Sequence, residues 1–250
     1  MDRPPLVLIN GYAATVADWD PSFLTALGET FTLICPENRG MGDAPLGDPA
    51  ALTIDAMATD VEVLLDERGV ERAAVAGWSM GGFVAQRLTA RSPAQVASLT
   101  LLATDPGGDA AIPAAPDVWA RLTDHSGTPR EQASRLIALL FPPEFAAMID
   151  REFGDVVASA RAALSTEALS AQEAAMAAWH ATPQPPVGAE SPPVLIVHGD
   201  SDVVIPPPNA DALASHWPGS RMERFAGGGH AFMAQEPDRV AGLIADFASP

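Results

Sequence analysis

The sequence contains no lysine: all 14 of its basic residues are arginines, set against 32 acidic residues. Without lysine the chain has no amine for a Schiff base and no lysine for a phosphate-binding loop. The net charge of −18 disfavours binding to nucleic acids and to anionic membranes, because both carry negative charge. We therefore predict a small-molecule substrate, with no nucleic-acid partner and no membrane partner.

Cysteine is also scarce, since Cys35 is the only one and no intrachain disulfide can form. Its position in the apolar run Phe31–Cys35 indicates a small core residue. The sequence shows no charged amino-terminal segment followed by a long apolar run, and no apolar segment of membrane-spanning length. These features predict a soluble, cytoplasmic protein, and 250 residues suffice for one domain with a large core.

Short apolar runs alternate with amphipathic segments along most of the chain. A continuous apolar run is typical of a strand buried in a parallel sheet. The predicted strands are Leu6–Ile9, Phe31–Cys35, Ala73–Ala76, Leu99–Ala103, Val194–Val197 and Arg221–Phe225. The helices predicted among them are Ile54–Arg68, Gly82–Arg91, Pro207–Trp217 and Pro237–Phe247. The alternation predicts an α/β fold with a mostly parallel sheet flanked by helices.

The alternation stops between Pro106 and Pro193, where we find no convincing strand. Four helices are expected there instead, namely Pro116–Thr123, Pro129–Leu140, Pro143–Gly154 and Thr166–His180, with Thr182–Pro186 as a closing linker. The segment carries too much apolar surface for a disordered linker. We therefore predict a single domain whose core comprises residues 1–105 and 194–250, with a helical lid inserted as residues 106–193.

A serine lies where the third predicted strand turns into a helix, in the sequence Gly77-Trp78-Ser79-Met80-Gly81. Glycines are needed there because the chain reverses sharply and larger side chains would clash, while the serine hydroxyl stays exposed. The Met80 N–H, at the positive end of the helix dipole, is placed to face a developing oxyanion. This context predicts Ser79 as a nucleophile.

A serine acts as a nucleophile near neutral pH when a histidine removes its proton and a carboxylate orients that histidine. Three glycines precede His230 and allow the chain to bring it over the edge of the sheet. Asp200 and Asp202 follow the fifth predicted strand, at the edge where open α/β sheets form their crevices. Asp105, after the fourth strand, is a third candidate acid. The other histidines, His125, His180, His198 and His216, are expected to be structural or surface residues.

Together these segments resemble the α/β-hydrolase superfamily over nearly the whole chain. The matching motifs are Ile9–Tyr12, Asn38–Gly42, the turn at Ser79, Gly199–Pro206 and Gly229-His230. The order Ser, Asp, His is that of the family. The resemblance implies that Ser79 is the nucleophile, His230 the base and later the acid, and Asp202 the orienting carboxylate. It also implies that Tyr12 and Met80 donate the two N–H groups of an oxyanion hole.

Asn10 stands where many members of the superfamily carry histidine, and we expect its side chain to bond the loop or the substrate. We also assign Gly11, Trp78 and Trp179 to substrate binding. Because the first predicted strand begins at Leu6, the amino-terminal hairpin usual in the family has almost no room. We therefore expect this hairpin to be truncated.

These features predict a lidded, esterase-like serine hydrolase without a metal or an organic cofactor. It would cleave a carboxylic ester, thioester or lactone of a small to medium apolar substrate through an acyl-enzyme. A cofactor-free perhydrolase or haloperoxidase, or a hydrolase of carbon–carbon bonds beside a carbonyl, would use the same residues. A ligand receptor or a non-hydrolytic cyclase of the same fold is the alternative from another class. The sequence leaves the substrate and the oligomeric state open.

Overall fold

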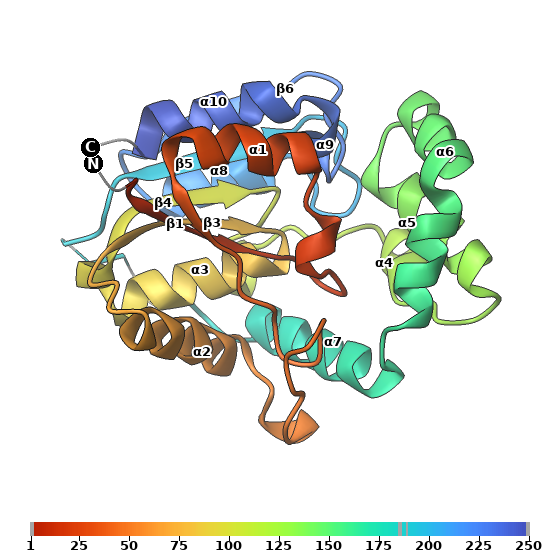
Figure 1. Ribbon diagram of the computed structural model, residues 1–250, viewed down its shortest axis with the longest axis horizontal. Coiled ribbons are helices and arrows are strands. Elements are labelled where there is room, and N and C mark those ends of the chain that lie inside the picture. The colour runs from red at the N-terminus through yellow and green to blue at the C-terminus, as the bar shows by residue number, and fades with distance from the viewer. Residues whose placement is uncertain (1–2, 185–186, 189, 249–250) are drawn as a thin grey trace.

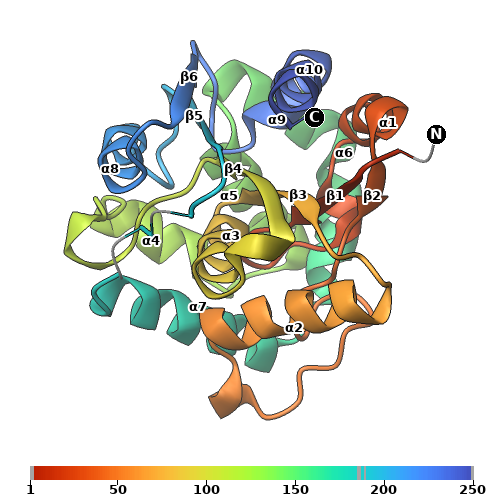
Figure 2. The same ribbon diagram turned by 90° about the vertical axis from the view of Figure 1, so that its left-hand side faces the viewer.

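One parallel sheet forms the centre of the computed structural model, which describes residues 3–184, 187–188 and 190–248. In this part of the chain six strands follow the order β2-β1-β3-β4-β5-β6, and all neighbours are parallel. The strands are β1 (Pro5–Ile9), β2 (Thr32–Ile34), β3 (Ala73–Trp78), β4 (Val96–Leu102), β5 (Val194–Gly199) and β6 (Arg221–Phe225). Helices flank the sheet on both faces (Figures 1 and 2), which confirms the predicted α/β fold.

Side chains of successive strand residues enter two separate cores, one on each face of the sheet. The covering helices are α1 (Pro21–Thr30), α2 (Ile54–Glu67), α3 (Met80–Arg91), α8 (Asn209–His216), α9 (Phe232–Gln235) and α10 (Pro237–Ala248). In β1, Val7 and Ile9 join the core that includes α2 and α3, whereas Leu6 and Leu8 join the core that includes α1 and α10. Because both faces are covered, the central strands β1, β3, β4 and β5 are mainly apolar, whereas the edge strands β2 and β6 are partly exposed.

Four helices lie between β4 and β5, namely α4 (Pro116–Leu122), α5 (Pro129–Leu140), α6 (Pro143–Ala162) and α7 (Thr166–Ala181). We call residues 106–193 the helical insertion, and among those that the structure describes no strand occurs. Proline occupies the first helical position of α4, α5 and α6, where its missing N–H costs nothing. In Figure 1, α4 to α6 stand beside the sheet, while α7 runs below it near α2.

The prediction that a helix ends at Gly154 is wrong, because α6 continues to Ala162. A glycine inside a helix costs about 1 kcal/mol relative to alanine and often marks a helix end. Here it permits a close helix contact, since a Cβ at Gly154 would lie 2.5 Å from Cζ of Arg130 on α5. Arg130 in turn pairs with Asp150 of α6 at 2.6 Å, so a side chain at position 154 would displace the arginine from this contact between the two helices.

The sequence analysis missed α1 and α9. Asp20 caps α1 by accepting hydrogen bonds from the N–H groups of Ser22 and Phe23, and Pro21 follows it. This start signal is visible in the sequence. Two expectations stay untested: the truncated hairpin, and the linker Thr182–Pro186, of which residues 185–186 lie outside the described part of the chain. None of the helices described in the structure is long and apolar enough to cross a membrane.

Candidate active site

Ser79 sits between β3 and α3 with φ 55° and ψ −122°, a backbone conformation that costs free energy for a residue with a Cβ. A Cβ at Gly77 would overlap the carbonyl of Gly81, and a Cβ at Gly81 would overlap the carbonyl of Ile9. Thr104 Oγ1 donates a hydrogen bond of 2.8 Å to the Ser79 carbonyl and helps to hold the turn. The close approaches explain why both glycines flank the serine.

His230 and Asp202 come from the loops that follow β6 and β5, and both are buried. His230 Nδ1 lies 2.8 Å from Asp202 Oδ2. Because a carboxylate only accepts hydrogen bonds, Nδ1 carries the proton that makes this bond. This tautomer leaves Nε2 of a neutral His230 free to accept a proton.

Four donors surround the Asp202 carboxylate. Oδ1 accepts hydrogen bonds from the N–H groups of Val204 and Ile205 at 2.8 and 3.0 Å. His198 Nε2 lies 3.4 Å from Oδ2 while it donates to the Ile205 carbonyl at 2.8 Å. Burial opposes ionisation of Asp202, but His230 and His198 outweigh it and lower the pKa of Asp202 to about 2. The carboxylate therefore stays ionised and orients His230.

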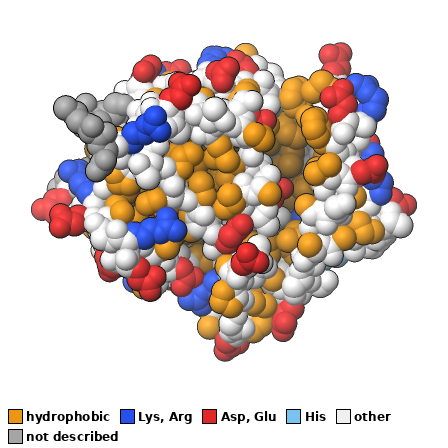
Figure 3. Space-filling model, viewed as in Figure 1, with side chains coloured by type: hydrophobic (Ala, Val, Ile, Leu, Met, Phe, Trp, Pro, Cys, Tyr) orange, Lys and Arg blue, Asp and Glu red, His pale blue; other side chains and the backbone are white. Residues whose placement is uncertain are grey.

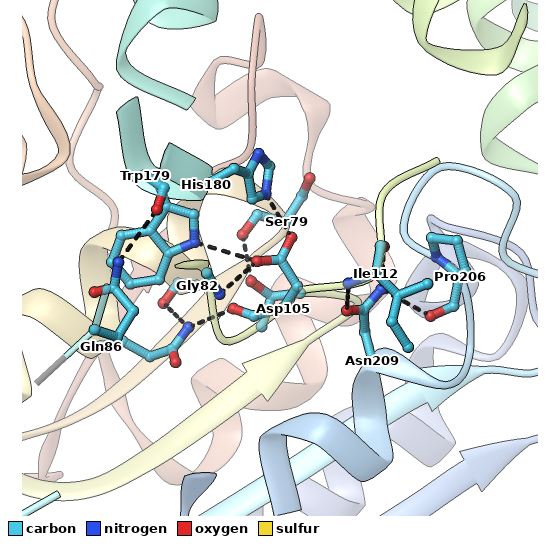
Figure 4. Close-up of polar contacts among 12 residues, drawn as sticks. Ser79, Gly82, Gln86, Asp105, Ile112, Trp179, His180, Pro206 and Asn209 are labelled. Atoms are coloured by element: carbon cyan, nitrogen blue, oxygen red, sulfur yellow. Dashed lines mark hydrogen bonds and ion pairs between the residues drawn. The ribbon is translucent and has the colours of Figure 1, made fainter. Parts of the chain in front are cut away.

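The two other candidate acids bind elsewhere. Asp105 Oδ2 lies 3.0 Å from His180 Nε2, and Oδ1 accepts a hydrogen bond of 3.2 Å from the indole of Trp179 (Figure 4). Asp200 Oδ1 accepts a hydrogen bond of 2.6 Å from the Gly227 N–H, which is a loop contact. Among the described residues, neither carboxylate is hydrogen-bonded to the imidazole of His230.

A cavity of about 740 Å³ lies between the sheet and the helical insertion, and Ser79 and His230 both line it. Figure 3 shows the corresponding hollow with hydrophobic side chains along it. The insertion contributes apolar lining residues that include Ile112, Trp119, Phe141, Phe153, Val156 and Met176. No hydrogen bond joins the Ser79 hydroxyl to His230 in the part of the chain that the structure describes. Such catalytic bonds are often long before a substrate binds.

The oxyanion-hole residues predicted from the sequence lie beside Ser79. Tyr12 and Gly11 line the cavity, and Met80 is the first residue of α3. Neither the Tyr12 nor the Met80 backbone N–H donates a hydrogen bond to another described residue. The Tyr12 ring hydroxyl donates a 2.6 Å hydrogen bond to Glu173, and burial, with this carboxylate beside it, raises the pKa of Tyr12.

Trp78 lines the cavity and also contacts His230. Its indole N–H donates a hydrogen bond of 2.9 Å to the His230 carbonyl, and the ring centroids are 5.5 Å apart. This contact ties the histidine loop to the strand that carries the serine. Trp78 therefore has a structural role besides the predicted contact with a substrate.

Asn10 and Trp179 were assigned to substrate binding, but neither is among the described residues that line this cavity. Asn10 is fully buried, and its amide donates a hydrogen bond of 2.7 Å to the Thr15 carbonyl. Trp179 stacks on Phe83 at 5.1 Å between ring centroids. Asn10 thus makes the loop contact, one of its two expected roles, and Trp179 lines a smaller pocket instead.

Sequence reasoning missed the position of His180, which lines the cavity at the end of α7. No local pattern marks this residue, because its pairing with Asp105 depends on how α7 packs against the end of β4. Among the described residues, no group of three or more His, Cys, Asp or Glu side chains is arranged to hold a metal ion.

Comparisons with known proteins agree with the fold. A family model described as alpha/beta hydrolase fold matches residues 4–237. The chain is 32% identical to a pimeloyl-[acyl-carrier protein] methyl ester esterase of Aromatoleum aromaticum, over 98% of each chain. It is 28% identical to a putative carbamate hydrolase RutD of Variovorax paradoxus, over 98% of this chain and 92% of the relative.

The crystal structure of an enol-lactonase from Burkholderia xenovorans LB400 shows the same fold. Its TM-score is 0.82 at 23% sequence identity, and the match covers 100% of this chain and 93% of the lactonase. With a parallel sheet, a strained serine between strand and helix, and a family model matching residues 4–237, the chain belongs to the alpha/beta hydrolase fold family.

Proposed function

We propose that the protein is a serine esterase that cleaves a carboxylic ester of a small to medium, neutral and apolar acyl group. The observation that carries this proposal is the buried hydrogen bond of His230 to Asp202, with His230 lining the same cavity as Ser79. Family membership supports a hydrolase, and the relative named a methyl ester esterase supports an ester as the bond cleaved. Thioesters and lactones are related substrates, because the same acyl chemistry cleaves them.

In the first half-reaction, Ser79 Oγ attacks the ester carbonyl carbon while His230 Nε2 takes the hydroxyl proton. The negative charge that develops on the carbonyl oxygen is stabilised by the backbone N–H groups of Tyr12 and Met80. The ion pair with Asp202 stabilises the imidazolium that forms. The imidazolium then returns its proton to the departing alcohol, which leaves the acyl group on Ser79.

In the second half-reaction, His230 removes a proton from a water molecule, and the water oxygen attacks the acyl carbon. The same two backbone N–H groups stabilise the second oxyanion. When this intermediate collapses, the proton returns from His230 to Ser79 Oγ and the carboxylic acid product is released. No group other than Ser79 becomes covalently attached to the substrate.

The preference for a neutral substrate rests on the charges around the cavity. Among the described residues that line it, no arginine occurs, whereas Asp18, Asp20 and Asp105 do. One partly buried arginine, Arg161 of α6, lies behind this lining beside Tyr12 and Asp18, where it offsets part of the negative charge. Residues 106–193 also carry 11 acidic side chains against five arginines. This negative field opposes the entry of a substrate that carries a free carboxylate.

Labelling with a fluorophosphonate and turnover of short-chain aryl esters test the proposal. We expect one label per chain on Ser79 and measurable turnover. Ser79→Ala is expected to lose the label and at least about a thousandfold in kcat, the scale for loss of a triad nucleophile.

Ser98→Ala is the matched control, because Ser98 is a buried serine of β4 whose hydroxyl has no partner among the described residues. It should keep the label and the activity. A folded parent that binds esters without turnover or labelling would instead be a receptor or another non-hydrolytic member of the fold.

The cytoplasmic location remains a prediction from the sequence.

A further inference from the structure

The loop that carries the proposed oxyanion donor Tyr12 is bent in an unfavourable way. Ala13, the next residue, has φ 56° although it is not a glycine. The left-handed region costs an L-residue with a Cβ roughly 1–2 kcal/mol, so it is occupied only when the surroundings hold it there. The groups that hold the Ala13 N–H fix the Tyr12–Ala13 peptide, which is next along the chain to the peptide that carries the Tyr12 N–H.

The first of these groups is the amide of Gln172 on α7. Gln172 Oε1 accepts a hydrogen bond of 3.0 Å from the Ala13 N–H, and the Gln172 side chain is completely buried. Gln172 Nε2 donates to the Arg39 carbonyl at 3.4 Å. Because one end of the amide faces a carbonyl and the other an N–H, this side chain fits in one orientation only.

The second group is the next residue of the same helix, Glu173. Its Oε1 accepts a hydrogen bond of 2.6 Å from the Tyr12 hydroxyl and lies 2.8 Å from His125 Nε2. Two adjacent residues of α7 thus hold two adjacent residues of the loop. The Tyr12 hydroxyl bond to Glu173 and the Ala13 N–H bond to Gln172 both lead to α7, which belongs to the helical insertion and not to the sheet. The Tyr12 hydroxyl also lies beside Arg161 of α6, in the same insertion.

We infer that Gln172 is a positioning residue of the oxyanion hole and that α7 sets the direction of the Tyr12 N–H. The inference rests on the proposed function, in which this N–H stabilises the oxyanion. An oxyanion donor works only within about 2.7–3.1 Å of the oxygen, and a shift of about 1 Å lowers rates by about a hundredfold. The helical insertion is therefore part of the catalytic machinery as well as a wall of the cavity.

Gln172→Leu tests the inference, because leucine fills a similar volume but cannot accept the Ala13 hydrogen bond. With a short aryl ester we expect kcat to fall about 30- to 100-fold and KM to change less than about threefold. The inhibition constant of a trifluoromethyl ketone, whose adduct with Ser79 carries an oxyanion, should rise by the factor by which kcat/KM falls. Gln95→Leu, a change far from the cavity on an exposed hydrogen bond to Asp66, is the matched control and should alter neither value.

Adding Ala13→Gly to Gln172→Leu distinguishes positioning from packing. Glycine adopts φ 56° without the cost of a Cβ, so the double variant should recover kcat several-fold. If Gln172→Leu keeps the parent kcat, the inference is wrong. It is also wrong if kcat falls while the ketone still binds as tightly and glycine restores nothing.

Tyr12→Phe provides a second test that leaves Gln172 in place. Removing the bond to Glu173 should lower kcat about three- to tenfold with little change in KM, and an unchanged kcat would count against the role of α7. If Gln172→Leu does not fold, the kcat of Tyr12→Phe tests the inference in its place. Failure of the proposed function is recognised separately, because the parent would then not be labelled on Ser79.

Discussion

His230 and Asp202 are 28 residues apart in the sequence and are joined by a buried hydrogen bond of 2.8 Å. A second imidazole–carboxylate pair, His180 with Asp105, lines the same cavity at 3.0 Å. The two pairs differ in origin, since the second one links α7 of the helical insertion to the end of β4. Asp202 is therefore the candidate orienting acid for His230, and Asp105 is occupied by a different histidine.

Asp202→Asn is expected to lower kcat by about a thousandfold or more, because an amide no longer fixes the His230 tautomer. Asp105→Asn should keep kcat within about tenfold and lower the melting temperature, since it loses the charge beside His180. Steady-state kinetics of both variants measure kcat, and thermal unfolding measures their melting temperatures. A severe loss of kcat in Asp105→Asn with a mild one in Asp202→Asn would move the orienting acid to β4.

Acid should remove a stabilising contribution of Asp202. Its pKa is lowered from 3.8 to about 2, so the folded state binds this proton less readily than the unfolded state. The contribution, on the order of 2 kcal/mol, is present above about pH 4 and is lost as the pH falls through 2. Urea unfolding between pH 5 and 2 should show a shallower fall in unfolding free energy for Asp202→Asn than for the parent. Parallel curves would contradict the prediction.

Trp78→Phe should lower kcat about tenfold, because the His230 carbonyl loses its indole donor and the histidine loop is held less firmly. The rate of fluorophosphonate labelling should fall with it. Trp217→Phe is the matched control: Trp217 is buried, and its indole donates to Gln86 at 3.3 Å, away from this cavity. Equal losses of kcat in both variants would show that only general packing is affected.

The cavity should discriminate against anionic acyl groups. We expect a lower kcat/KM for the half-ester of a dicarboxylic acid than for a neutral ester of equal length, and a smaller difference at high salt. Asp18→Asn, at the cavity lining, should reduce the discrimination, whereas Asp109→Asn, outside that lining, should not. A preference for the half-ester at low salt would refute the neutral-substrate proposal.

The sequence by itself determined the order of the strands and of most helices, and the position of the candidate nucleophile. Buried parallel strands are continuous apolar runs, and the turn at Ser79 needs Gly77 and Gly81 because no Cβ fits against the facing carbonyls. These features depend on residues close in the sequence or on burial, and each produces a pattern that can be recognised within a short stretch of the sequence. The continuation of α6 beyond Gly154 produced no such pattern, since the space beside that glycine is filled by the side chain of an arginine on another helix.

Only the tertiary structure decided which side chains meet. Asp105, Asp200 and Asp202 all follow sheet strands, and the packing of the loops after β5 and β6 selects Asp202 as the partner of His230. The packing of α7 also placed Trp179 against Phe83, outside the cavity lining, and brought Gln172 within hydrogen-bond distance of Ala13. Contacts between distant segments depend on how whole helices and loops pack against one another. Hydrophobic periodicity within one segment predicts its secondary structure but not these contacts.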